Sequence, residues 1–179
     1  MRPLRREGVV HVVPRDVKWQ PPTEGHYKVN CDASLDVQNQ VVGIGLIICD
    51  SFGLVMAAAA QRIRASYSPL IAEVVAVLHG VDFAVNTGLW PLLIETDALR
   101  VVNMVKTGSA SAVGIGLVVG DVIAHLRNSS GVSVMFVSGK ANYVAHTISK
   151  LALGLTEDRF WIEEHRLCVE RYILDEYPG

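Results

Sequence analysis

The stretch that decides the fold reads YKVNCD, residues 27–32. Apolar and polar side chains alternate along it, with Tyr27, Val29 and Cys31 set against Lys28, Asn30 and Asp32. This period of two is typical of a β-strand, which we expect to end at Asp32. An apolar run at 43–49 and a segment at 54–64 follow, separated by the turn Asp50-Ser51-Phe52-Gly53. The sequence therefore predicts three consecutive strands, the last two joined as a hairpin.

Beyond the hairpin, predicted helices alternate with strands. Ser68 and Pro69 offer a capping hydroxyl and a first-turn proline, both typical of a helix start. This helix should reach about Asn86, because Gly88 suits its C-terminal end. The further expected elements are a strand at 92–96, a short helix through Lys106, a helix around 118–126, a strand at 132–137 and a helix at 142–153. This order predicts an α/β fold with a five-stranded mixed sheet, in which three antiparallel strands precede parallel ones and helices cover both faces.

Length and composition fit one domain with terminal extensions. The chain has 179 residues, of which 50% are hydrophobic, enough for a sizeable core. Residues 1–26 contain several prolines and no sustained periodicity, so we expect an irregular leader before a domain at 27–155. Residues 156–179 include Trp161 and are expected to form a docked tail with a less regular helix.

Charge and hydropathy argue against some classes of protein. The longest unbroken apolar run, residues 54–60, is far short of the roughly 20 residues of a membrane helix. The first residues lack a long apolar signal segment, so we expect an intracellular protein of the nucleus or cytoplasm, with an organelle less favoured. The net charge is −2, from 16 basic and 18 acidic side chains, which does not by itself indicate a nucleic-acid binder. Any functional interpretation therefore depends on individual site residues.

The helix after Ser68 carries a glutamate in an unexpected place. One apolar stripe consists of Ile71, Val74, Val75 and Leu78. A second face consists of Glu73, Ala76, Val77, Gly80 and Ala84, mostly small residues that suit close packing on a sheet. A buried carboxylate must be paired, bind a metal or face a cleft, because leaving it unpaired is costly. The alternative is that Glu73 is simply favoured by the helix dipole.

Two aspartates follow predicted strands. Asp32 could begin an Asx turn, and Asp97 could cap the helix that starts at Ala98. Together with Glu73, however, both carboxylates could converge at one edge of the sheet, where such an oxygen cluster suits Mg²⁺.

His146 lies in the first turn of the helix predicted at 142–153, whose apolar face we assign to Val144, Ile148 and Leu151. The positive end of the helix dipole should keep its imidazole largely neutral, able to bind a metal or donate one hydrogen bond. The alternative is a half-buried polar residue near Tyr143. Glycine motifs add no chemistry: Gly43-Ile44-Gly45 lies inside a predicted strand and needs no ligand.

Several segments resemble a known family in their order and spacing. They are Lys28-Val29-Asn30-Cys31-Asp32-Ala33-Ser34, Ala72-Glu73-Val74-Val75-Ala76, Glu95-Thr96-Asp97-Ala98 and Ala141-Asn142-Tyr143-Val144-Ala145-His146. They resemble the catalytic segments of type 1 ribonucleases H, in particular the plant ribonuclease H-like family related to the tail domains of non-LTR retrotransposon reverse transcriptases. The resemblance covers residues 19–161, most of the chain.

The resemblance implies a metal-dependent endonuclease that cuts the RNA strand of RNA–DNA hybrids by a two-metal mechanism. Asp32, Glu73 and Asp97 would bind Mg²⁺, with Mn²⁺ as a substitute, and His146 would occupy a fourth catalytic position where the family's enzymes usually carry a carboxylate. The expected partner is the hybrid itself, bound by a monomer with no membrane contact. Neither protein partners nor nucleic-acid-binding residues are indicated.

The alternative is a weakly active or inactive ribonuclease H-like module that binds nucleic acid or protein. His146 favours it, as does the interval between the fourth and fifth strands. Bacterial enzymes of the type that the chain resembles carry a basic helix and loop in this interval. Here the interval offers only Arg100, Lys106 and Arg127 as basic residues.

Overall fold

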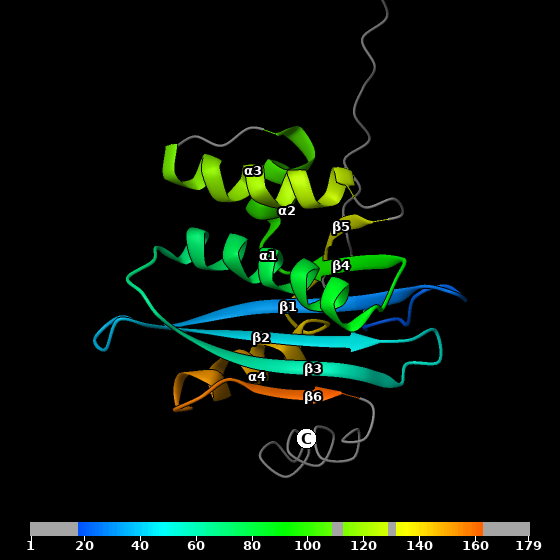
Figure 1. Cartoon of the computed structure of the whole chain (residues 1–179), viewed down its shortest axis with the longest axis horizontal. Helices are drawn as coiled ribbons and strands as arrows, with labels where there is room; N and C mark the ends of the chain where they lie inside the picture. The colour runs from blue at the N-terminus through cyan, green and yellow to red at the C-terminus, as the bar shows by residue number, and fades with distance from the viewer. Residues whose placement is uncertain (1–17, 109–112, 129–131, 163–179) are drawn as a thin grey trace, which may run out of the picture.

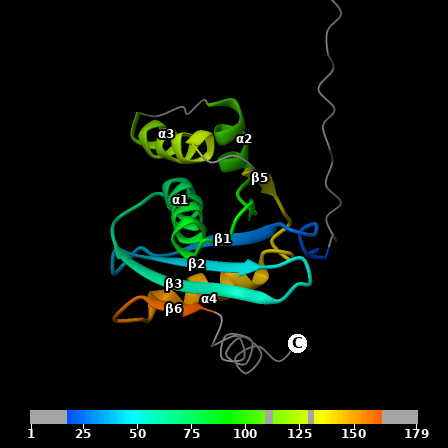
Figure 2. The same cartoon turned by 45° about the vertical axis from the view of Figure 1, so that its right-hand side comes forward.

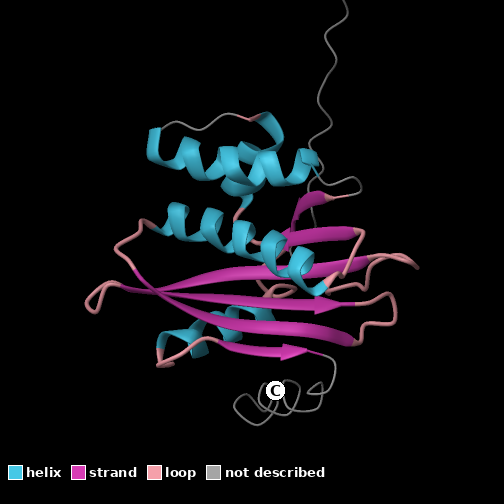
Figure 3. Cartoon of the chain, in the orientation of Figure 1, coloured by secondary structure: helices cyan, strands magenta, loops and turns pink. Residues whose placement is uncertain are grey.

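The fold is built on one six-stranded sheet, seen in a computed structural model that describes residues 18–108, 113–128 and 132–162 (Figure 1). The strands are β1 Tyr27–Asp36, β2 Val41–Cys49, β3 Val55–Arg64, β4 Leu92–Thr96, β5 Ser133–Phe136 and β6 Arg159–Ile162. The helices are α1 Pro69–Thr87, α2 Leu99–Thr107, α3 Val113–Asn128 and α4 Tyr143–Leu153 (Figure 3). The predicted leader up to residue 17 and the predicted tail from residue 163 lie outside the described residues.

The sheet is mixed, with strand order β5-β4-β1-β2-β3-β6. β1, β2 and β3 pair antiparallel, whereas β4 pairs parallel with β1 and β5 parallel with β4. The predicted α/β fold, with antiparallel strands followed by parallel ones, is confirmed.

The number of strands differs from the prediction by one. Arg159–Ile162 was expected to belong to a helical tail, but it forms β6 and pairs antiparallel with β3. Its ladder runs from Ala57 opposite Ile162 to Ala60 opposite Arg159. A strand of four residues is too short to show a period, so only its pairing with the free edge of β3 reveals it.

β1 is longer than expected. It was predicted to end at Asp32, but it continues to Asp36, and this extension pairs with Ile44 through Val41 of β2. The turn is formed by Asp36, whose Oδ1 accepts a hydrogen bond from the backbone nitrogen of Asn39 at 3.0 Å. Asp32 therefore lies inside a strand, and its interpretation as the start of an Asx turn is wrong.

The helices lie on both faces of the sheet, with α1, α2 and α3 on one face and α4 on the other (Figures 1 and 2). α1 begins at its predicted cap, where Ser68 Oγ accepts a hydrogen bond from the Ile71 nitrogen, and ends before Gly88 in the left-handed conformation. Its length and apolar composition would also suit a membrane span, but the packing of α1 between the sheet and α3 accounts for them. On the predicted small-residue face, Ala76, Val77, Gly80 and Ala84 are buried as expected, whereas Glu73 is half-buried. Gly80 comes close to Cys31 of β1.

α4 packs on the opposite face over a second, smaller core, formed by Ile47, Cys49, Val55, Ala58, Ala60, Ala145, Ile148 and Ala152. Gly43 and Gly45 of β2 make this packing unusually close. A methyl group at Gly45 would collide with the Ala145 carbonyl oxygen, and one at Gly43 with the Ser149 carbonyl oxygen. The two glycines inside a strand are therefore explained by the helix backbone that rests on them.

Candidate metal centre

Three carboxylates from three different elements meet in one place. Asp32 comes from β1, Glu73 from α1, and Asp97 follows directly after β4. One carboxylate oxygen from each lies within 4.8 Å of those from the other two. The parallel pairing of β1 and β4 sets Asn30 beside Glu95. Two residues further along each segment, Asp32 and Asp97 are therefore neighbours. The structure thus brings together the three carboxylates that the sequence singled out as candidate metal ligands.

The surroundings of Glu73 disfavour its ionised form. Burial first, and then the nearby charges of Asp32 and Asp97, raise its pKa to about 8, although a hydrogen bond from the Ala33 backbone opposes the shift. Its Oε2 is buried and has no hydrogen-bond partner among the described residues. Helix-dipole stabilisation alone does not account for an unpartnered buried oxygen. A cluster of three carboxylates that includes such an oxygen fits a divalent cation such as Mg²⁺, which prefers oxygen ligands.

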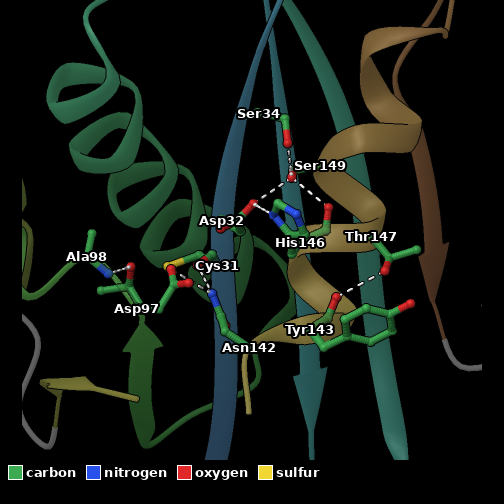
Figure 4. A network of polar contacts seen from close by, with 11 residues as sticks. Cys31, Asp32, Ser34, Asp97, Ala98, Asn142, Tyr143, His146, Thr147 and Ser149 are labelled. Carbon is green, nitrogen blue, oxygen red and sulfur yellow. Dashed lines mark hydrogen bonds and ion pairs between the residues drawn. The ribbon is translucent and has the colours of Figure 1, made fainter. Parts of the chain in front are cut away.

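Asp32 is 3% exposed, and burial is the main cause that raises its pKa. Two hydrogen bonds to its Oδ2 oppose the shift, one from Ser149 Oγ at 2.6 Å and one with His146 Nδ1 at 3.1 Å (Figure 4). An ionised carboxylate only accepts, so Nδ1 of His146 carries a proton in this contact. The Nε2 atom of a neutral ring then keeps its lone pair.

His146 thus lies beside the acidic cluster, in contact with Asp32. Its side chain is 42% exposed, so it lies at the mouth of the acidic cluster rather than inside it. The alternative of a half-buried polar residue describes its exposure correctly, but not its contact with Asp32.

Asp97 does not act as a helix cap. α2 starts after Ala98, which makes no side-chain capping bond, and the Ala98 nitrogen instead donates to Thr96 Oγ1 at 3.2 Å. The structural explanation offered for Asp97 is therefore wrong. The carboxylate is instead contacted by Asn142, whose Nδ2 lies 3.4 Å from Asp97 Oδ1.

Asn142 is a site residue that sequence reasoning missed. It is almost fully buried, its Nδ2 also donates to the Cys31 carbonyl oxygen at 3.0 Å, and its Oδ1 accepts from Asn30 Nδ2 at 3.2 Å. The sequence suggested only a helix start at this position, but the side chain makes no capping bond. It connects β1 to Asp97 across the centre (Figure 4).

A buried ion pair lies beside this network. Lys28 Nζ is 2.7 Å from Glu95 Oε1, and Asn30 Nδ2 donates to Glu95 Oε2 at 3.1 Å. Trp19 joins the network, because its Nε1 donates to Asn30 Oδ1 at 2.9 Å and Lys28 lies over its ring. Glu95 is thus neutralised by Lys28, which separates its role from that of the three clustered carboxylates.

The strand order, the helices on both faces and the acidic cluster define a ribonuclease H-like domain. The chain belongs to the reverse transcriptase-like family, whose model matches residues 30–152. The comparison with curated proteins found no match.

Solved structures show the same fold at low sequence identity. RNase H1 from the archaeon Halobacterium salinarum is 15% identical, with a TM-score of 0.66 over 72% of this chain and 98% of that one. The N-terminal RNase H domain of a Mycobacterium tuberculosis protein is 18% identical, with a TM-score of 0.64 over 72% and 93%. LC11-RNase H1, solved in complex with an RNA/DNA hybrid, is 13% identical, with a TM-score of 0.63 over 71% and 96%.

Proposed function

We propose that this protein is a metal-dependent endonuclease that hydrolyses the RNA strand of RNA–DNA hybrids. The observation that carries the proposal is the gathering of Asp32, Glu73 and Asp97 within 4.8 Å of one another, with a buried Glu73 oxygen that no described residue hydrogen-bonds. The ribonuclease H fold supports it, and so does the hybrid bound by the similar LC11-RNase H1.

The three carboxylates would hold Mg²⁺, with Mn²⁺ as a substitute. When bound, two such ions would activate a water molecule and stabilise the leaving 3′-oxygen. Glu73 must lose its proton to bind a cation, and the cation in turn removes the cost of its buried charge. Asn142 holds Asp97 in place through the 3.4 Å contact with its Oδ1. At the mouth of the centre, Nε2 of His146 would accept a hydrogen bond from water or take up a proton.

Recognition of the hybrid would depend on its shape and on the 2′-hydroxyl groups of its RNA strand. The net charge of −2 and the few basic residues between β4 and β5 predict modest affinity that falls steeply with salt. We also propose that the protein acts as a monomer inside the cell, in the nucleus or cytoplasm. A plant and retrotransposon origin remains a prediction from the sequence resemblance.

His146 favours a second candidate, a ribonuclease H-like module that binds hybrids or proteins without cutting. A histidine contributes no negative charge to a metal centre, whereas the enzymes that the chain resembles usually carry a carboxylate at this position, although histidine is common there in the plant branch. Metal binding and cleavage separate the two candidates.

The test is cleavage of a labelled RNA–DNA hybrid at low salt, with Mg²⁺ and separately with Mn²⁺. Asp97→Asn should abolish cutting, whereas Asp121→Asn, an exposed aspartate on α3, should leave it unchanged. Circular dichroism of each variant verifies folding. If the folded wild-type protein binds the hybrid but cuts with neither metal, the binding module is the correct function.

A further inference from the structure

The backbone of α4 rests directly on β2, and Ser149 is the residue of α4 that approaches both Gly43 and Gly45. A methyl group at Gly43 would collide with the Ser149 carbonyl oxygen, and one at Gly45 with the Ser149 nitrogen. Any side chain at either glycine would therefore push the helix away from the sheet. The pair Gly43 and Gly45 forms a notch in β2 that receives the helix backbone at Ser149 and, over Gly45, at Ala145.

The register of the sheet shows what the notch places beside Ser149. Gly45 pairs with Asp32 of β1, and Gly43 pairs with Ser34. The Ser149 hydroxyl oxygen lies 2.6 Å from Asp32 Oδ2 and 2.7 Å from Ser34 Oγ (Figure 4). Ser149 is fully buried and Ser34 nearly so, which shields both contacts from water. The two glycines of β2 thus bring a hydroxyl of α4 onto the aspartate of β1.

The direction of these hydrogen bonds follows from the chemistry of the partners. Two acceptors compete for the single proton of Ser149, because the His146 carbonyl oxygen lies 2.8 Å and Asp32 Oδ2 2.6 Å from its hydroxyl oxygen. The negative charge and the shorter distance favour an ionised Asp32 as the acceptor, and Ser34 then donates its own proton to Ser149. His146 Nδ1 contacts the same Oδ2 at 3.1 Å. Two donors from one helix therefore fix one oxygen of the carboxylate, which leaves Oδ1 available for a cation.

We propose that Ser149 is a positioning residue of the metal centre: its hydroxyl fixes the orientation of the Asp32 carboxylate so that one oxygen binds a divalent cation. This inference rests on the proposed function and adds to it a residue that would not touch substrate or metal. Outer hydrogen-bond partners of metal ligands contribute about 10–100-fold to metal affinity or activity in other proteins. A single short, buried bond places Ser149 at the lower end of this range.

The test compares Ser149→Ala and Ser149→Cys with a control, Thr147→Val. Cysteine fills the space of the serine but donates only weakly, so it separates loss of the hydrogen bond from loss of packing. Thr147 is a buried hydroxyl residue on the same helix that donates to the Tyr143 carbonyl oxygen, away from Asp32. Calorimetric titration with Mn²⁺ and with Mg²⁺ measures metal affinity without any cleavage, and steady-state kinetics on the hybrid follow.

Both Ser149 variants should bind the metals about 10-fold more weakly and have a lower kcat, while KM for the hybrid stays unchanged. Thr147→Val should resemble the wild type in all three quantities. Affinity restored in Ser149→Cys would show that Ser149 acts only through packing and would overturn the proposal. Unchanged affinity in Ser149→Ala would also overturn it while leaving the nuclease intact. A wild-type protein that binds neither metal would overturn the proposed function and this inference with it.

Discussion

Glu73 is half-buried, and the Oε2 atom of its carboxyl group is fully buried with no hydrogen-bond partner in the part of the chain that the structure describes. Such a group is more stable protonated than charged, because the folded protein replaces only part of its hydration. A site with this property is poorly suited to the metal-free protein and well suited to a protein that holds a cation. The cost of the buried charge is thus an argument for a metal centre that does not depend on family resemblance.

A pH dependence of stability follows from the same residue. The pKa of Glu73 in the folded protein is about 8, above its ordinary value of 4.5, so folding favours the protonated form. Its contribution to stability is fully present below pH 4.5 and is lost as the pH rises through 8. The raised pKa of Asp32 acts in the same direction.

Urea denaturation in EDTA at several pH values between 5 and 9 measures this effect. The wild-type protein should lose stability across the range, and Glu73→Gln should flatten the profile. Saturating Mg²⁺ should also restore stability at the alkaline end, because the cation replaces the proton. Identical profiles for the wild type and Glu73→Gln would show that Glu73 is not buried as a charged group.

Among single residues, those with an unusual local context could be predicted from the sequence. Glu73 stands out on a small-residue helix face, and Asp32 and Asp97 stand next to apolar runs. Asn142 and Ser149 could not be predicted, because a polar residue at a helix start or inside a helix is ordinary. Their roles depend on which strand residues they meet, and only the packed structure shows that.

At the scale of elements, α4 combines two faces with different tasks. Asn142, its N-cap, and His146 and Ser149 in the helix itself recur at spacings of four and three residues and face β1. A neighbouring face packs on the sheet through Ala145, Ile148 and Ala152. One helix therefore carries both the packing surface and three side chains of the candidate centre.

The predicted apolar face of this helix was partly wrong. Val144 and Leu151 were assigned to it with Ile148, but both are only partly buried, whereas Ala145 and Ala152 are fully buried. The close approach over Gly43 and Gly45 explains the difference. Large side chains cannot fit where a helix backbone touches a strand, so alanines occupy the core face.

Gly45→Ala tests the importance of this close approach. The added methyl group would collide with the Ala145 carbonyl oxygen and the Ser149 nitrogen, so we expect a loss of stability of about 1–3 kcal/mol or more. Metal affinity should fall as well, since α4 would be displaced from Asp32. Chemical denaturation and metal titration measure the two effects.

The matched control is Gly120→Ala on α3, where an added methyl group would meet nothing within 4 Å. That exposed helical position should gain about 0.5–1 kcal/mol. If Gly45→Ala proves as harmless as Gly120→Ala, the notch is not needed for the packing of α4.

At the scale of the whole molecule, local connections were predictable and distant ones were not. β1, β2 and β3 follow one another through short turns, so their pairing could be inferred from pattern alone. β6 joins the sheet from a distant part of the chain with four residues, and no local sequence signal predicts it.

The burial of the polar side chains of β1 could not be predicted from the sequence either. Alternating apolar and polar residues are typical of a strand with one solvent-exposed face, but Lys28, Asn30, Asp32 and Ser34 are all buried.

The charge distribution leads to the last prediction. A protein of net charge −2 that binds a polyanion must depend on a few well-placed basic side chains. Lys140 is exposed in the loop between β5 and α4, next to Gly139, which lies close to Asp97. A phosphate of a hybrid bound at the acidic cluster would pass near this lysine, so we expect Lys140 to make a phosphate contact.

Hybrid binding is measured in the Asp97→Asn background, which should bind without cutting, across a series of salt concentrations. Lys140→Gln should weaken binding at low salt and reduce the slope of log affinity against log salt by about 1, as the loss of one phosphate contact requires. Lys150→Gln, which changes another exposed lysine near the other end of α4, should change neither quantity. Equal effects of the two variants would mean that the hybrid senses only overall charge and that its path does not run past the N-terminal end of α4.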